Sequence, residues 1–140
     1  MTTIAITRHR PASVLAIIAV LFFLGITAVG GGLALLMGYT PPQDWLDGVP
    51  LITNWVVPGL VLGIVFGLGS LVTAYGVLTR HRWSWAATVL IGLGHMVWIG
   101  LELLFLPAAS ALQLIYGPVG LALAGLPFLP SVRQYLRLWR

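Results

Sequence analysis

Residues 85–106 form a stretch that is apolar enough to cross a membrane, yet it contains His95 and Glu102. A transmembrane helix needs about 20 consecutive, mostly apolar residues. Because a helix returns to nearly the same face after about seven residues, His95 and Glu102 are expected on one stripe. On the insertion scale, an acidic side chain such as Asp at a helix centre costs about 2.5 to 3.5 kcal/mol. We therefore expect polar groups from elsewhere in the chain to face this stripe.

The composition places most of the chain in lipid. Only 7% of the 140 residues are charged and 59% are hydrophobic, whereas a soluble domain has about 25% charged residues. The net charge of +4 comes from arginines in short segments between apolar runs. That distribution is typical of membrane orientation and excludes nucleic acid as a partner. The chain has no cysteine, which excludes disulfides, thiol catalysis and thiolate metal sites.

Four apolar runs predict an all-α, polytopic membrane protein: a four-transmembrane-helix antiparallel bundle in which residues 1–140 form one membrane domain. The last two runs are separated by so few residues that their helices must be antiparallel neighbours. The first run is too long for the apolar region of a signal peptide, so we expect it to be retained. The expected segments are spans at about 12–37, 55–78, 85–106 and 109–129, an outer loop at 38–54 and a cytoplasmic tail at 131–140.

Glycine recurs every four residues along the second run, at Gly59, Gly63 and Gly67. This spacing leaves one face of the helix without side chains, so another helix can approach closely. The pattern favours a packing seam within the chain over the face of a homodimer.

The outer loop contains the spacing of a helix capping box at Thr40 and Gln43. With a proline at the next position and a glycine a few residues later, this spacing predicts a short interfacial helix over about 41–47. Trp45 and Trp55 are expected at the depth of the lipid headgroups. An irregular polar loop is the alternative.

The tail repeats the capping-box spacing at Ser131 and Gln134 and predicts a C-terminal amphipathic helix. Arg133, Arg137 and Arg140 fall on one side, which suits an anionic membrane surface. A frayed tail is the alternative at this length. The expected apolar face consists of Val132, Tyr135, Leu136 and Trp139.

With four spans, every arginine falls on one side of the membrane, and Asp44 and Asp47 fall on the other. The positive-inside rule then puts both ends of the chain and the turn at 79–82 in the cytoplasm. We expect a multi-pass protein of the cell inner membrane that is in contact with membrane lipids.

Counting about 1.5 Å per residue from the outer ends of the spans puts Gln113 level with Glu102. Tyr116 shares a helix face with Gln113, so the candidate ligand-binding residues are His95, Trp98, Glu102, Gln113 and Tyr116. Two interpretations remain open. Either the glycines let the helices close and Glu102 bonds to Gln113 or Tyr116 as a polar clamp, or they leave a pocket in the outer half for a lipid-like ligand.

Chemistry at this site is an alternative to simple binding. His95 and Glu102 lie about 10 Å apart along the helix axis, so they could act as acid and base on two parts of one apolar substrate, as in an isomerase. A directly bonded dyad does not fit that distance. His95 is the one histidine within a span, whereas a metal site usually needs about three or four ligands. We therefore expect no metal and no cofactor, haem included.

Three stretches carry a resemblance: PPQDWLDGVPLITNWVVPGLVLGIVFGLGSL, WIGLELLFLP and LPSVRQYLR. In them the chain resembles small, uncharacterised four-helix integral membrane proteins of bacteria. This resemblance implies the fold and brings no activity with it. A looser similarity, in the number of spans and the glycine content, is to DoxX-like four-helix proteins.

The predicted function is that of a non-enzymatic membrane protein, either an accessory subunit or a binder of a lipid-like, apolar ligand in the outer half of the bundle. The alternative is an intramembrane enzyme that uses His95 and Glu102. A homo-oligomer or a larger membrane complex remains open as the assembled form.

The predicted topology can be tested with single cysteines, since the chain contains none. In intact cells or spheroplasts, Asp47→Cys should react with an impermeant thiol reagent, and His81→Cys should react only after the membrane is permeabilised. The reverse pattern of labelling would contradict the orientation with both ends in the cytoplasm.

Overall fold

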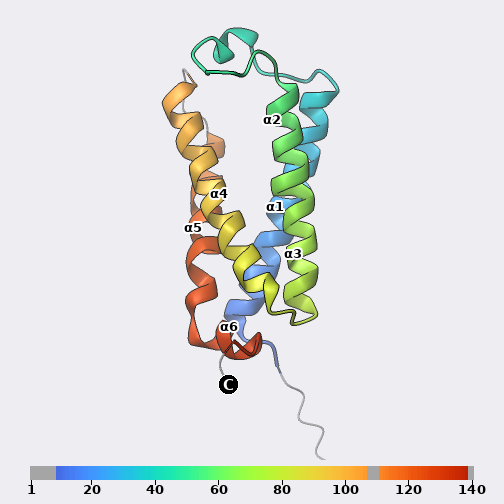
Figure 1. The fold of residues 1–140 in the computed structure, drawn as a ribbon, viewed down its shortest axis with the longest axis vertical. Coiled ribbons are helices and arrows are strands. Elements are labelled where there is room, and N and C mark those ends of the chain that lie inside the picture. The colour runs from blue at the N-terminus through green and yellow to red at the C-terminus, as the bar shows by residue number, and fades with distance from the viewer. Residues whose placement is uncertain (1–8, 107–110, 139–140) are drawn as a thin grey trace, which may run out of the picture.

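The computed structural model describes residues 9–106 and 111–138, in which the regular secondary structure is helical, with no strand (Figure 1). Four of the helices are long and apolar enough to cross a membrane, as the sequence predicts. The elements are α1 (Ala12–Leu36), η1 (Gln43–Leu46), α2 (Val56–Leu60), η2 (Val61–Leu68), α3 (Gly69–Leu78), α4 (Trp83–Phe105), α5 (Ala111–Gly125), η3 (Leu126–Phe128) and α6 (Pro130–Tyr135).

The ranges that could span a membrane lie close to the predicted ones, and they are Ala12–Leu36, Val56–Leu78, Trp83–Phe105 and Ala111–Phe128. Residues 109 and 110, where the last span was expected to begin, lie outside the described residues. Pro118 lies inside α5, and the α-helix gives way after Gly125 to the 3-10 turn η3.

The second span is not a uniform α-helix. It consists of α2, the π-helical segment η2 and α3, which follow one another without a break. A π-helix bonds each residue to the fifth one along, so it is wider than an α-helix and is rare beyond one turn. The glycine spacing that we used to predict the seam gives no signal for this change.

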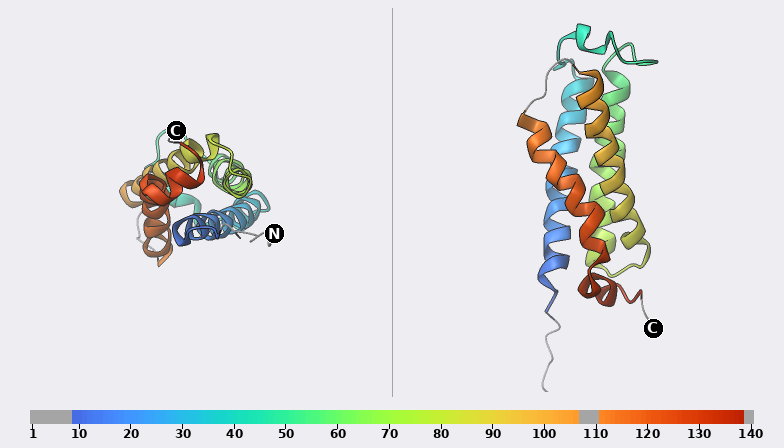
Figure 2. Two further views of the ribbon diagram at one scale, coloured as in Figure 1. Left: turned by 90° about the horizontal axis from the view of Figure 1, so that it is seen from below. Right: turned by 90° about the vertical axis from the view of Figure 1, so that its left-hand side faces the viewer.

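The four long helices form two hairpins (Figures 1 and 2). α1 packs along α2, η2 and α3, and α4 packs along α5. Between the hairpins the main contacts are those of α3 with α4 and of α1 with α5. In Figure 1, α4 approaches α3 at the end that carries α6, while the opposite ends of α4 and α2 stand apart under the loop that joins α1 to α2.

The glycine stripe is a packing seam within the chain, as predicted. A Cβ atom on Gly32 of α1 would lie 2.6 Å from the carbonyl oxygen of Gly59 and 2.6 Å from the amide nitrogen of Gly63. A Cβ atom on Gly67 would lie 2.9 Å from the backbone nitrogen of Val29. Because these neighbours are backbone atoms, they cannot move aside as a flexible side chain would. The two helices therefore touch through their backbones.

One end of the molecule carries the described arginines. The start of α1, the turn between α3 and α4, and α6 all lie at this end, and the loop with Asp44 and Asp47 lies at the other (Figure 1). The guanidinium of Arg80 lies over the ring of Tyr135, 4.6 Å from its centroid. The guanidinium of Arg133 lies 5.5 Å from the ring centroid of Phe128. These contacts join α6 to the turn after α3 and to η3.

The apolar face of the tail does not point outward, in contrast to the prediction of a helix lying on lipid. Val132 and Leu136 are each 1% exposed and Tyr135 is 8% exposed, because they pack into the core of the protein. The expected cap is also absent: Leu129 precedes the helix, and the hydroxyl of Ser131 instead bonds to that of Ser13 on α1 at 2.8 Å. Of the three predicted surface arginines, Arg133 is partly buried and Arg137 is exposed, while Arg140 lies outside the described residues. Trp139, predicted on the apolar face, also lies outside them.

The outer loop also differs from its prediction. Its helix is the short 3-10 turn η1, and Thr40 does not cap it; Pro42 stands at the cap position without a side-chain bond. Gln43 instead donates from its amide to the carbonyl oxygen of Thr53 at 2.7 Å, which closes the loop. Trp55, expected at headgroup depth, is only 9% exposed because it is covered by protein.

The seam can be tested with a pair of alanine substitutions on α1. Gly32→Ala should destabilise the protein by about 1 to 3 kcal/mol, as overpacking does, because its Cβ meets backbone atoms. Gly30→Ala is the matched control, since no described atom lies within 4 Å of its Cβ position, and it should be neutral or stabilising. The readout is the midpoint of unfolding by SDS in mixed micelles. Equal midpoints for the two variants would contradict the seam.

Candidate functional site

A cavity of about 260 Å³ lies between the two hairpins. α1 and η2 supply one wall, and α4 and α5 supply the other. It exists because the seam holds α1 and η2 together on one side, while α4 and α5 pair separately on the other. The lining residues are Leu24, Thr27, Ala28, Gly31, Leu62, His95, Trp98, Ile99, Glu102, Leu112 and Tyr116.

His95 lies at the wall of this cavity and is 2% exposed. Its ring meets Phe66 edge-on, with 5.1 Å between the ring centroids, and Tyr116 in the same manner at 5.7 Å. Neither ring nitrogen of His95 has a hydrogen-bond partner among the described residues. Aromatic rings therefore hold the imidazole in place, and both of its nitrogens are buried without a hydrogen-bond partner among the described residues.

Glu102 is half-buried and accepts two hydrogen bonds. Trp98 donates from Nε1 to Oε1 of Glu102 at 2.6 Å, and Gln113 donates from Nε2 to Oε2 at 3.3 Å. The predicted contact with Gln113 is thus present, and it joins α4 to α5. Tyr116, the other predicted partner, instead stacks on Phe23 of α1, with 5.8 Å between the ring centroids.

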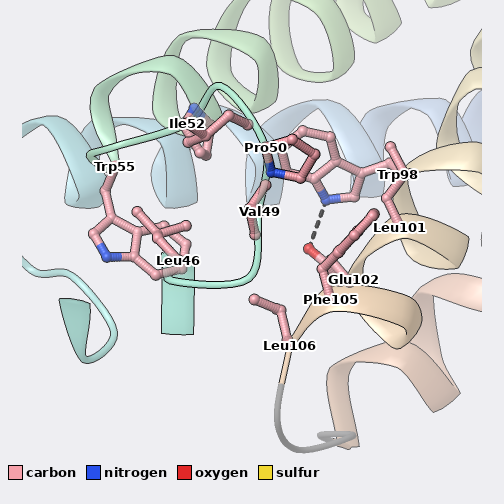
Figure 3. A pocket seen from close by; sticks show the side chains of 11 residues that line it. Leu46, Val49, Pro50, Ile52, Trp55, Trp98, Leu101, Glu102, Phe105 and Leu106 are labelled. Carbon is pink, nitrogen blue, oxygen red and sulfur yellow. Dashed lines mark hydrogen bonds between the residues drawn. The ribbon is translucent and has the colours of Figure 1, made fainter. Parts of the chain in front are cut away.

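A second cavity, of about 230 Å³, lies beneath the outer loop (Figure 3). Figure 3 shows Trp98 and Glu102 side by side, with their hydrogen bond drawn between them. These two residues line both cavities, so the pair stands between them. The remaining lining residues of this outer cavity are Leu46, Val49, Pro50, Ile52, Trp55, Pro58, Leu101, Phe105 and Leu106.

The structure contains both of the predicted alternatives, closely packed helices and a cavity. Gly32 is used in the seam, whereas Gly31, next to it, lines the cavity between the hairpins. Gly30 and Gly117 have no described atom within 4 Å of their Cβ positions. The structure therefore contains both the hydrogen-bonded Glu102 and open space beside it. Ligand binding in that space stays a prediction.

Some residues of the two cavities could not be identified from the sequence. Trp98 was a candidate, but its bond to Glu102 was missed even though the two stand four residues apart, where helix side chains meet. Phe66, which packs on the rings of His95 and Trp98 without lining either cavity, was missed because an apolar residue in a span carries no signal of its own. The loop residues of the outer cavity are brought there by the fold of the loop, which has no periodic pattern.

The chemistry that the site offers is hydrogen bonding in an apolar enclosure. His95 and Glu102 line one cavity but are not bonded to each other. Within the described ranges no group of three His, Asp or Glu side chains could hold a metal ion. A neutral imidazole has one donor and one acceptor nitrogen, so His95 could bind a group that both accepts and donates.

Fold and site together define an all-helical protein with four helices that could cross a membrane. His95 and Glu102 line a cavity between its two hairpins. In comparisons with known proteins, the chain matches no family model, no curated protein and no solved structure.

The role of Glu102 as a link between helices can be tested by substitution. Glu102→Gln keeps an acceptor for Trp98 and should leave stability nearly unchanged. Glu102→Leu leaves the side-chain amide of Gln113 on α5, as well as the indole N–H, without its acceptor and should cost about 0.6 to 1.7 kcal/mol, from the average to the largest value measured for bonds between membrane helices. Unfolding by SDS in mixed micelles gives the comparison, and Leu104→Gln, on the exposed side of α4, is the control for a polar substitution. If Glu102→Leu is as stable as the parent protein, the hydrogen bonds do not hold the helices.

Proposed function

We propose that the chain is an integral protein of the cell inner membrane, a four-span antiparallel bundle with both ends of the chain in the cytoplasm. Four helices that could cross a membrane support this proposal. So does the gathering of the arginines at the end of α6, opposite the loop with Asp44 and Asp47, because positive charge stays on the cytoplasmic side. On this proposal Arg133 and Arg137 lie near the inner lipid surface, together with Arg140.

Within that setting, we propose that the protein binds an uncharged amphipathic ligand in the cavity between the hairpins. The observation that carries this proposal is His95. A buried polar group without a partner costs about 1 to 3 kcal/mol, and His95, which lines the cavity, has two such nitrogens. A hydroxyl or carbonyl group on the ligand would satisfy them.

The rest of the lining indicates the character of the ligand. Leu24, Ala28, Leu62 and Leu112 favour a hydrocarbon body. Neither arginine nor lysine occurs in the described lining of either cavity, so an anionic head would lack a counter-charge. The oxygens of Glu102 already accept bonds from Trp98 and Gln113. We therefore assign the head of the ligand to His95 and leave Glu102 as a link between helices.

The alternative of an intramembrane enzyme rests on one further observation, that His95 and Glu102 line the same cavity. Glu102→Gln distinguishes the two functions, because it preserves the hydrogen-bonding shape while removing the carboxyl group needed for proton transfer. A binder keeps its ligand in this variant. An enzyme would still bind its substrate but would no longer convert it.

The binding proposal can be tested with a photoreactive probe, dodecanol with a diazirine next to the hydroxyl-bearing carbon. The protein is reconstituted in liposomes, irradiated with the probe and weighed intact by mass spectrometry. Excess dodecanol should compete with labelling, whereas n-dodecane, which lacks the hydroxyl, should not.

His95→Phe should reduce labelling about tenfold, which corresponds to the loss of about 1.4 kcal/mol. His81→Phe, at an exposed histidine in the turn between α3 and α4, is the matched control and should label like the parent protein. Equal labelling of the two variants would show that the imidazole does not hold the head of the ligand.

A further inference from the structure

The outer cavity differs in character from the one that contains His95. Its lining consists of aliphatic, aromatic and proline side chains except at Glu102. Oε1 of Glu102 already accepts the indole N–H of Trp98. Trp55 also lines this cavity, and its indole N–H has no hydrogen-bond partner among the described residues. This cavity therefore offers a ligand mainly hydrophobic contact, with one unpaired donor at Trp55, whereas the inner cavity offers the two unpaired nitrogens of His95.

The two cavities meet at one pair of side chains. Trp98 and Glu102 stand one helical turn apart on α4 and face both spaces. The wall that the cavities share includes the indole of Trp98 and the carboxyl group of Glu102, which are hydrogen-bonded to each other (Figure 3). Side chains can rotate on a timescale far shorter than that of helix movement, so this wall can open without unpacking the hairpins.

The size of the cavities points in the same direction. Sites for small ligands usually enclose roughly 300 to 1,000 Å³. Each cavity alone, at about 260 Å³ and about 230 Å³, falls short of this range, and the two together reach it. A ligand that uses both spaces would match the usual size of a binding site.

We propose that the two cavities are compartments of one binding site, in which the inner compartment holds the hydrogen-bonding head of a neutral lipid-like molecule at His95 and the outer compartment, beneath the loop, holds its aliphatic chain. The Trp98–Glu102 pair is the partition beside which the ligand lies. This inference rests on the proposed function, because it takes the head of the ligand to be at His95.

The occupant of the outer compartment is the chain of that same ligand for two reasons. The compartment shares the lining residues Trp98 and Glu102 with the inner one. Its lining rewards hydrocarbon, since each buried methylene group contributes about 0.8 kcal/mol. The outer loop contributes Leu46, Val49 and Ile52 to this lining.

The test maps where each part of a probe lies. Two dodecanol probes are used with the protein in liposomes, one with the diazirine next to the hydroxyl-bearing carbon and one with it at the far end of the chain. Peptide mapping by mass spectrometry locates the labels. The head probe should label the inner lining at Leu24, Thr27 or Ala28, and the tail probe should label the outer lining at Val49, Ile52 or Leu101. Tail labels on the inner lining, or only on lipid-facing residues, would overturn the two-compartment site.

The second measurement uses a substitution that fills the outer compartment with a larger side chain. Val49→Trp should reduce competition by dodecanol at least fivefold, while competition by hexanol, whose short chain needs only the inner compartment, stays within twofold of the parent protein. Val57→Trp is the matched control, because Val57 is 50% exposed and lines neither cavity; it should leave both alcohols unchanged. An equal effect of Val49→Trp on the two alcohols, or none on either, would overturn the inference.

These results separate the two proposals. If His95→Phe abolishes head labelling but the tail label lies outside the outer compartment, the binding function stands and the two-compartment site is wrong. If His95→Phe has no effect, the binding function itself is wrong, whatever Val49→Trp does. If Val49→Trp does not fold, as judged by circular dichroism and gel filtration, the tail label in the parent protein decides the matter.

Discussion

The backbone contact between α1 and the second span is the constraint on which the rest of the structure depends. Gly32 lies against Gly59 and Gly63 so closely that a single methyl group would collide with main-chain atoms. In lipid, where apolar side chains gain little by meeting one another, such close packing is a main source of attraction between helices. The first hairpin is therefore tightly joined, and the second packs against it mainly through α3 with α4 and α1 with α5. The space between the hairpins follows from this unequal packing.

The sequence predicted the helices and the seam well, because both depend on local patterns. Apolar length defines a span, and glycine every four residues defines a face that can be approached closely. It did not predict what covers each apolar face. Lipid and protein interior are equally apolar, so Val132 and Leu136 could not be recognised as core residues, nor Trp55 as buried. The π-helical η2 was not predicted either, because no local pattern in the sequence indicated it.

The candidate site was predictable in part for a similar reason. Counting residues from the outer ends placed Gln113 level with Glu102, and the two are bonded. A count of depth does not give rotation about the helix axis, so Tyr116 was an equal candidate until the structure placed it against Phe23 and His95. The outer cavity had no counterpart in the sequence, because it forms only where an irregular loop folds over α4. Polar residues in a span could thus be placed by rule, and the hydrocarbon around them could not.

The π-helical segment makes the orientation of α3 depend on the number of residues that precede it in the second span. A helix whose bonds reach one residue further accommodates an extra residue, and each residue in a helix turns the chain by roughly 100°. α3 therefore presents Thr73, Ala74 and Val77 to the core only while the segment keeps its full count of residues. A homologue that lacks one residue between positions 61 and 68 would have α3 rotated away from α1 and α4. In an alignment of relatives, the absence of gaps in this segment would be the trace that its shape has been maintained by selection.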